Sequence, residues 1–339
     1  MSRNRRFNSV RLVFAALVLS ATACRIEPMP DATDAPPPPV AEYTLGAENT
    51  HARWSASIPP VLTVPSGAVV EVLTKEASDG QITPATLEAD LANVDFGLIH
   101  PLTGPIAVEG ASPGDILAVT IHEVEVTGWV WATILPGFGF LAEEFTEPWI
   151  RGFEMEPGAT EVAFNDDITI PLDPFPGVMG VAPATDSMLV TIPPRENGGN
   201  MDNRYLGPGT TVYFPVQVEG ANFSIGDAHA VQGDGEVSGT AIEAPVRVVF
   251  TVEVMDNPRG MVEPQYETDD YYAVTGFGTT IDEAARKATR YMIDYLVAEH
   301  GLSRNEAYVL CSLAGDLKIS ETVDVPHMLV SMHMPKGIF

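Results

Sequence analysis

Asp227 and His229 stand two residues apart in a glycine-rich stretch that runs from Gly226 to Glu236. If this stretch is extended, both side chains point to the same side, because side chains alternate along a strand. An imidazole and a carboxylate amid glycines suit a metal ion, since glycine allows the backbone to approach closely and the side chains supply hard-to-borderline ligands. The alternative is a buried histidine that is only hydrogen-bonded within a turn.

Two other stretches hold polar side chains in stiff turns. His100 opens the sequence His-Pro-Leu-Thr-Gly-Pro, and Asp202 ends the sequence Gly-Gly-Asn-Met-Asp. Two glycines before an Asn and an Asp let side-chain oxygens converge on a small site. The plainer alternatives are a hydrogen-bonded histidine in a turn and a loop with Asx-turns. Both stretches are therefore candidates for a site, and spacing alone does not decide between these interpretations.

Several common catalytic sequences are absent. The chain has no H-E-x-x-H, no G-x-S-x-G, no P-loop and no Ser-Ser-Lys pattern of the amidase-signature enzymes. Cys311 lies in an apolar helical run, which favours a buried structural thiol over a nucleophile.

The residues from 43 to 254 have a β pattern. Apolar and β-branched runs such as 69–73, 116–126 and 246–254 are separated by Gly and Pro at intervals of about ten residues, as in sandwiches and barrels. We therefore expect a mainly β fold with sandwich- or barrel-like sheets in this part.

The residues from 255 to 339 have a different pattern. Thr280 with Glu283, and Ser303 with Glu306, form capping-box sequences that begin two helices, and Gly301 is placed to end the first one. A strand-like stretch at 323–333 follows. We expect an α+β C-terminal portion that contains a helical hairpin and belongs to the same catalytic unit.

The N-terminal residues have the layout of an export signal. Arginines precede an apolar stretch at 12–19, and small residues lead to Cys24. We predict a lipoprotein-type signal peptide over 1–23 with Cys24 lipidated, and a Pro-rich tether over 24–42. Arg25 is not the Asp of an inner-membrane retention signal, so we expect attachment to the outer membrane, facing the periplasm or the cell surface. A plain secretory cleavage is the alternative.

Acidic side chains outnumber basic ones by 46 to 18, which gives a net charge of −28. This balance argues against nucleic acid as a partner, because phosphate neutralisation needs Lys and Arg. For the same reason we expect contact with a membrane only through the lipid anchor.

Taken together, a series of stretches resembles the acetamidase/formamidase family over residues 48–339. They include 79–82, 100–105, 108–115, 136–139, 198–202, 226–243, 307–308, 316–317, 323–326 and 335–336. The resemblance implies hydrolysis of a short linear amide to a carboxylate and ammonia, with a divalent metal that we expect to be zinc. It also implies a possible homo-oligomer. Alternatives are a non-catalytic ligand-binding surface lipoprotein on the same fold and a lactam or amino-acid-amide hydrolase.

The resemblance assigns the site residues by position. The metal-side groups are His100, Asp202, Asp227 and His229, and the catalytic candidates are Glu243 as general base and Glu144 as a second choice. A carboxylate beside an activated water can take its proton and pass it to the leaving nitrogen. Carboxylates gathered at one site repel each other without a cation, which favours a metal. The alternative for Glu243 is a structural partner to an arginine.

Overall fold

The computed structural model describes residues 37–156 and 158–339. The predicted signal peptide, Cys24 and most of the tether lie outside these residues. Pro38–Phe339 form one compact unit. Within the described residues, none of the helices combines the length and apolar character that crossing a membrane requires.

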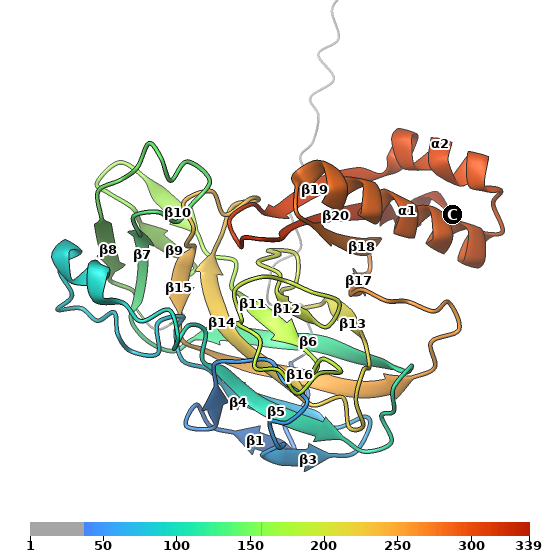
Figure 1. Ribbon diagram of the computed structural model, residues 1–339, viewed down its shortest axis with the longest axis horizontal. Coiled ribbons are helices and arrows are strands. Elements are labelled where there is room, and N and C mark those ends of the chain that lie inside the picture. Colours follow the sequence, from blue (N-terminus) through green and yellow to red (C-terminus); the bar gives the residue numbers. More distant parts are fainter. Residues whose placement is uncertain (1–36, 157) are drawn as a thin grey trace, which may run out of the picture. The chain divides into compact units, whose positions relative to one another are not determined.

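One nine-stranded sheet carries both the N-terminal and the C-terminal residues of this unit. Its strands, in spatial order, are β1 (Tyr43–Leu45), β4 (Val69–Leu73), β16 (Val246–Met255), β6 (Ile116–Val126), β13 (Thr211–Pro215), β17 (Gln265–Glu267), β18 (Tyr271–Gly278), β20 (Met328–Pro335) and β19 (Asp316–Glu321). The long strands β6 and β16 lie side by side at its centre (Figure 1).

A second sheet of the described residues carries the strands that matter for the site. Its main order is β12 (Gly198–Asn200), β11 (Phe175–Gly180), β14 (Phe223–Val231), β15 (Ile242–Ala244), β7 (Val130–Ile134) and β8 (Trp149–Phe153). β5 (Leu102–Val108) also pairs with β14, and β2 (Thr50–His51) and β3 (Leu62–Val64) pair with β5. β9 (Glu161–Ala163) and β10 (Thr169–Pro171) form a separate hairpin.

The two large sheets share one hydrophobic core. Leu117 and Phe250 of the first sheet and Ile106, Met179 and Phe223 of the second belong to the same buried cluster, and none of the five side chains is exposed. Burial of side chains of this size is worth about 1.5–3 kcal/mol each. This packing of sheet on sheet confirms the predicted mainly β fold.

The C-terminal helices pack against one end of the first sheet. α1 (Ile281–His300) and α2 (Arg304–Ala314) form a hairpin whose apolar side chains share a cluster with those of β18 and β20 (Figure 1). Thr280 and Ser303 cap the two helices through their side chains, as predicted, and Gly301 ends α1 in the left-handed conformation. Short 3-10 helices lie at η2 (Glu88–Asn93) and η3 (Lys336–Ile338).

Candidate active site

Strand register places three side chains of the second sheet in one row. His229 of β14 lies opposite Glu243 of β15, and Glu243 lies opposite Trp131 of β7. Directly opposite residues of antiparallel strands share a face of the sheet, so these three side chains are neighbours. His229 therefore lies in an extended strand, as predicted, whereas Asp227 departs from extended backbone with a φ of 45°.

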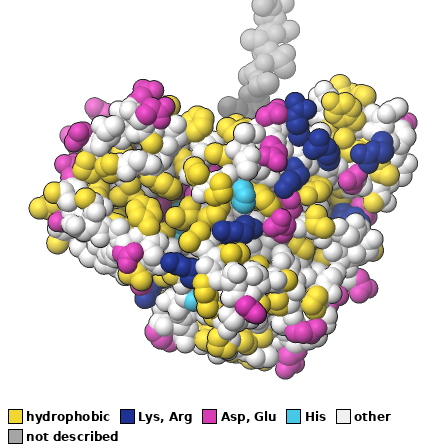
Figure 2. All heavy atoms as spheres, viewed as in Figure 1, with side chains coloured by type: hydrophobic (Ala, Val, Ile, Leu, Met, Phe, Trp, Pro, Cys, Tyr) yellow, Lys and Arg dark blue, Asp and Glu magenta, His cyan; other side chains and the backbone are white. Residues whose placement is uncertain are grey.

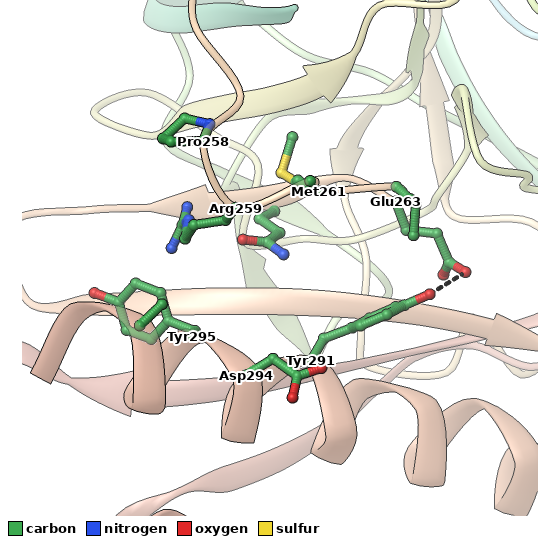
Figure 3. Close-up of a pocket in the computed structure, with 11 residues that line it drawn as sticks. Pro258, Arg259, Met261, Glu263, Tyr291, Asp294 and Tyr295 are labelled. Atoms are coloured by element: carbon green, nitrogen blue, oxygen red, sulfur yellow. Dashed lines mark hydrogen bonds between the residues drawn. The ribbon is translucent and has the colours of Figure 1, made fainter. Parts of the chain in front are cut away.

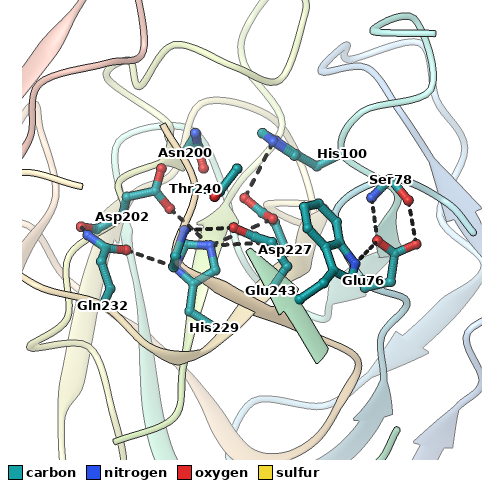
Figure 4. Close-up of polar contacts among 12 residues, drawn as sticks. Glu76, Ser78, His100, Asn200, Asp202, Asp227, His229, Gln232, Thr240 and Glu243 are labelled. Carbon is teal, nitrogen blue, oxygen red and sulfur yellow. Dashed lines mark hydrogen bonds and ion pairs between the residues drawn. The ribbon is translucent and has the colours of Figure 1, made fainter. Parts of the chain in front are cut away.

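His229 is the centre of this site. Its Nε2 lies 3.4 Å from Glu243 Oε2. It lies 3.8 Å from Asp202 Oδ1 and 3.8 Å from Asp227 Oδ1 (Figure 4). All four side chains are at most 2 % exposed. Asp202 comes from the loop after β12, so the fold brings together segments that are about 25 to 40 residues apart in the sequence.

The other ring nitrogen of His229 is held by Gln232. Gln232 Nε2 donates to the backbone oxygen of Asp202 at 2.7 Å, which leaves Oε1 to accept from His229 Nδ1 at 2.8 Å. Nδ1 therefore carries a proton, and Nε2 of a neutral ring presents its lone pair to three carboxylates. This arrangement is stable only with a positive charge at Nε2, either a proton or a metal ion.

Three carboxylate oxygens around Nε2 have no hydrogen-bond partner although they are fully buried: Asp202 Oδ1, Asp227 Oδ1 and Glu243 Oε2. A buried charged oxygen without a partner is costly, so a cation is the natural complement. Asp227, His229 and Glu243 have ligand atoms close enough together to hold one ion, as do Asp202, His229 and Glu236. The donor set thus fits a divalent metal.

The pKa values of these groups reflect the same crowding of charge. Burial raises the pKa of Glu243 to about 7 against the opposing effect of His229. Burial would also raise the pKa of Asp227, but His100 and His229 outweigh it and lower that pKa to about 2. For His229, the carboxylates of Glu243 and Asp227 overcome burial and raise its pKa well above the ordinary value.

Glycine and strained backbone make room for the cluster. A Cβ on Gly177 of β11 would collide with Asp202 Oδ1 and the backbone oxygen of Asp227. Asp202, Asp227 and Glu236 have φ values of 37°, 45° and 43°, in the left-handed region that non-glycine residues rarely occupy. Strain of this kind is retained where the surrounding structure fixes a functional geometry.

Further buried carboxyls surround the cluster. Asp324 accepts a hydrogen bond from Asn200 Nδ2 at 2.8 Å, and burial raises the pKa values of Asp324 and Glu236 well above their ordinary values. Burial likewise raises the pKa of Glu321 to about 8. The raised pKa values mean that these buried carboxyls favour the protonated, uncharged form, so the shell does not add fixed negative charge around the cluster.

A cavity of about 40 Å³ opens onto the cluster. Its polar side chains are His100, Asn200, Asp202, Asp227, Glu236, Thr240, Glu243 and Asp324, and its apolar ones are Ala77, Phe96, Ile99, Trp131, Leu135, Phe138 and Ile192. The lining thus offers polar side chains to an amide group and apolar side chains to a small hydrocarbon group.

A larger cavity of about 210 Å³ lies between the loop 258–263 and α1 (Figure 3). Its acidic groups are already paired. Glu263 accepts from Lys287 at 2.7 Å and from Tyr291 at 2.9 Å, and Asp294 pairs with Arg304. We therefore assign the chemistry to the smaller cavity.

Five of the six residues proposed from the sequence meet in this cluster, and four of them, all except His229, line the cavity. His100 lies at its edge, with Nε2 3.5 Å from Asp227 Oδ2. The ion pair of Glu243 is with His229, where the alternative prediction had an arginine. Glu144 is the exception: it lies in a turn that begins at Leu141, and its side chain is exposed. The fold does not bring Glu144 to the cluster.

Sequence reasoning did not single out Gly177, Gln232, Glu236 or Asp324. Gln232 and Glu236 stand in the same glycine-rich stretch as Asp227, and Asp324 stands in the stretch 323–326, so their positions offered a signal. Gly177 offered none, because only the pairing of β11 with β14 brings it under the site.

Comparison with known proteins gives a consistent result. The Acetamidase/Formamidase family matches this chain over residues 41–189 and 184–339. An acetamidase of Mycolicibacterium smegmatis is 29 % identical over 77 % of this chain and 84 % of its own length. A formamidase of Methylophilus methylotrophus is 29 % identical over 85 % of this chain and 89 % of its own.

A solved structure is also similar. The crystal structure of an acetamidase from Bacillus halodurans superimposes with a TM-score of 0.82 and 34 % sequence identity. The match covers 87 % of this chain and 98 % of that chain. Similarity over nearly the whole described unit favours an enzyme over a non-catalytic binding protein.

Proposed function

Because this chain belongs to the acetamidase/formamidase family, we propose that it hydrolyses a short linear amide to a carboxylate and ammonia with the help of a divalent metal ion. The observation that carries the metal-assisted part is the set of three unpartnered carboxylate oxygens around His229 Nε2. A cavity lined by both polar and apolar side chains supports a substrate with a polar amide head and a small acyl group.

The two groups that could hold an ion share His229, and we propose that Asp202 and Asp227, one from each group, complete the metal site with His100 beside Asp227. We expect zinc, because imidazole and carboxylate are among its usual ligands. A bound divalent ion supplies Lewis-acid polarisation of the amide carbonyl and makes a water more acidic.

Glu243 is the proposed general base. Its Oε1 accepts from the backbone N–H of Ala241 at 2.9 Å, which fixes the carboxylate so that the free Oε2 faces the cluster. Glu243 takes a proton from the attacking water as the water oxygen bonds to the carbonyl carbon. The same proton then goes to the nitrogen, so that the C–N bond breaks with its electron pair on the departing ammonia.

The experiment is an ammonia-release assay of the purified protein with formamide and acetamide, coupled to metal analysis. We expect release of ammonia by the metal-containing protein, loss on chelation and recovery on addition of zinc. Unchanged activity after complete removal of the metal would contradict the metal-assisted mechanism. No release from either amide would contradict the proposed substrates.

We also propose that the protein is exported and lipid-anchored at the outer membrane, facing the periplasm or the cell surface. The arginine-rich start, the apolar stretch 12–19 and Cys24 support this localisation. Metabolic labelling with a fatty acid tests it. Label should enter the wild type and not the Cys24→Ser variant, and an unlabelled wild type found inside the cell contradicts it.

A homo-oligomer is the last part of the proposal. The exposed apolar side chains of α2 support it, since Val309 is 56 % and Leu313 is 78 % exposed. Light scattering of the purified protein should give a mass of more than one chain. A single-chain mass at micromolar concentration contradicts this part.

A further inference from the structure

We propose that Trp131, held in place by Glu76, forms an apolar wall of the cavity and limits the substrate to amides with the shortest acyl groups. This inference rests on the proposed amide hydrolysis at the same site and names the substrate class. Neither residue was singled out by the sequence, although Glu76 stands three residues before the stretch 79–82.

The position of the indole follows from strand register. Trp131 of β7 lies opposite Glu243 of β15, so its side chain stands next to the proposed base on the same face of the sheet. It is 2 % exposed and lines the cavity together with Ala77 and Leu135. The polar side chains of the lining suit the amide group of a substrate, which leaves its acyl group to contact apolar walls such as Trp131.

Glu76 fixes the orientation of the indole. Trp131 Nε1 donates to Glu76 Oε2 at 3.1 Å. The same carboxylate accepts from the backbone N–H and the hydroxyl of Ser78, each at 2.8 Å, and from the N–H of Gly80 (Figure 4). Four donors satisfy this buried carboxylate, so Glu76 joins the loop that carries Ala77 to the indole on the other wall. Glu76 is thus a positioning residue.

The size of the cavity sets the limit. A volume of about 40 Å³ holds on the order of three water-sized groups, at roughly 10–15 Å³ each. Formamide and acetamide are close to this size, whereas butyramide is two methylene groups longer than acetamide. One methylene group in a hydrophobic pocket changes kcat/KM by about 10–200-fold. We therefore expect strong rejection of butyramide by the wild-type enzyme.

The test compares Trp131→Leu with Trp149→Leu, a matched control on the neighbouring strand β8 that does not line the cavity. The readout is the ratio of kcat/KM for butyramide to that for acetamide, with metal content measured for each variant. Trp131→Leu should raise this ratio about tenfold or more, and the control should leave it unchanged. If Trp131→Leu does not fold, Trp131→Phe takes its place in the test. This variant keeps an aromatic ring and should shift the ratio in the same direction.

Glu76→Gln tests the positioning role. The glutamine side chain has an NH2 group in place of one acceptor oxygen of Glu76. It can therefore no longer accept from all four donors, and the indole loses its fixed orientation. The ratio should rise with metal content unchanged, and less than additively when combined with Trp131→Phe. A wild-type ratio in this variant contradicts the positioning role.

A wild-type ratio in both Trp131 variants overturns the inference. If the wild type turns over no amide, the proposed function fails, and calorimetric binding of the same amides decides the inference separately. Binding of butyramide gained only in Trp131→Leu supports the size limit. If the wild type and Trp131→Leu bind the same amides, or if neither binds any amide, the inference is overturned.

Discussion

At the scale of single residues, the site depends on what faces His229 Nε2. Gln232 fixes the proton on Nδ1, so the opposite nitrogen meets carboxylates from Asp202, Asp227 and Glu243. Without a cation, the negative charges of these carboxylates would face one another with too few hydrogen-bond donors to satisfy their oxygens. The role of each carboxylate depends on how it is oriented. Glu243 differs from the others because the backbone N–H of Ala241 holds its Oε1, which leaves Oε2 facing the cluster.

Replacing Glu243 by Gln should leave the metal bound and lower kcat by about 10²–10⁴-fold, since the amide cannot take a proton. The exposed Glu144→Gln variant is the matched control and should keep full activity. The measurements are kcat for acetamide and metal per chain. If Glu243→Gln loses its metal, Glu243 is a ligand and its assignment as the base is wrong.

Local rules predicted part of this residue-scale picture. The spacing of Asp227 and His229 predicted that they share a site, and glycine spacing drew attention to Asp202, but the left-handed backbone of Asp227 was not predicted. Partners such as Trp131 and Glu76 could not be predicted, because they are 55 residues apart and meet only through the folded sheet.

At the scale of elements, the helices were predictable because their signals are local. The capping residues Thr280 and Ser303 lie beside the turns they cap, and each cap is worth about 1 kcal/mol. The order of strands was not predictable, because pairings such as β6 with β16 join residues more than a hundred positions apart. Hydrophobic pattern specifies a strand and its faces but not its neighbour.

Strand β11 must carry glycine at position 177, because a side chain there would enter the cluster. Gly177→Ala should lower the metal content and activity while the protein still folds. Gly233→Ala is a control, since its added methyl group would meet no atom within 4 Å. Metal analysis and circular dichroism compare the two variants. Equal metal content in Gly177→Ala and the wild type would show that the strand tolerates a side chain here.

Strand β20 contains a buried titratable group away from the cluster. Burial, and to a lesser degree Lys318, lowers the pKa of His333 to about 4, and the ring nitrogen Nε2 lies 2.7 Å from the Tyr266 hydroxyl. In the unfolded chain His333 binds its proton as the pH falls through about 6.5, whereas in the folded chain it does so only near pH 4. This group therefore contributes stability above pH 6.5 that is lost as the pH falls toward 4.

The loss amounts to on the order of 3 kcal/mol. We expect His333→Gln to unfold with a smaller loss of stability between about pH 7 and pH 4 than the wild type, because glutamine does not titrate. Urea unfolding at both pH values measures the difference. Identical pH dependence in the two proteins would contradict the depressed pKa.

At the scale of the whole molecule, the surplus of acid is found on the visible surface as well as in the buried cluster. Figure 2 shows Asp and Glu side chains scattered over the visible face. The net charge is −28, and removal of residues 1–23 would take away four arginines and no acid, leaving 14 basic against 46 acidic side chains and a net charge of −32. Charge of one sign spread in this way destabilises the compact state through self-repulsion.

Salt should therefore stabilise the protein. Between about 0.01 M and 1 M ionic strength the Debye length falls from about 30 Å to 3 Å, so the repulsion is screened. We expect Tm to rise by about 2–4 °C for each kcal/mol of repulsion removed. Thermal unfolding in sodium chloride measures this effect, and a Tm that is flat or falls with salt contradicts it.

The central claim is that the cluster around His229 binds a divalent metal on which amide hydrolysis depends. The most direct test is the Asp227→Ala, His229→Ala double variant, with metal per chain and ammonia release from acetamide measured on the same folded sample. We predict that the wild type retains a divalent metal and releases ammonia, and that the variant does neither. Full ammonia release by the variant would contradict the claim.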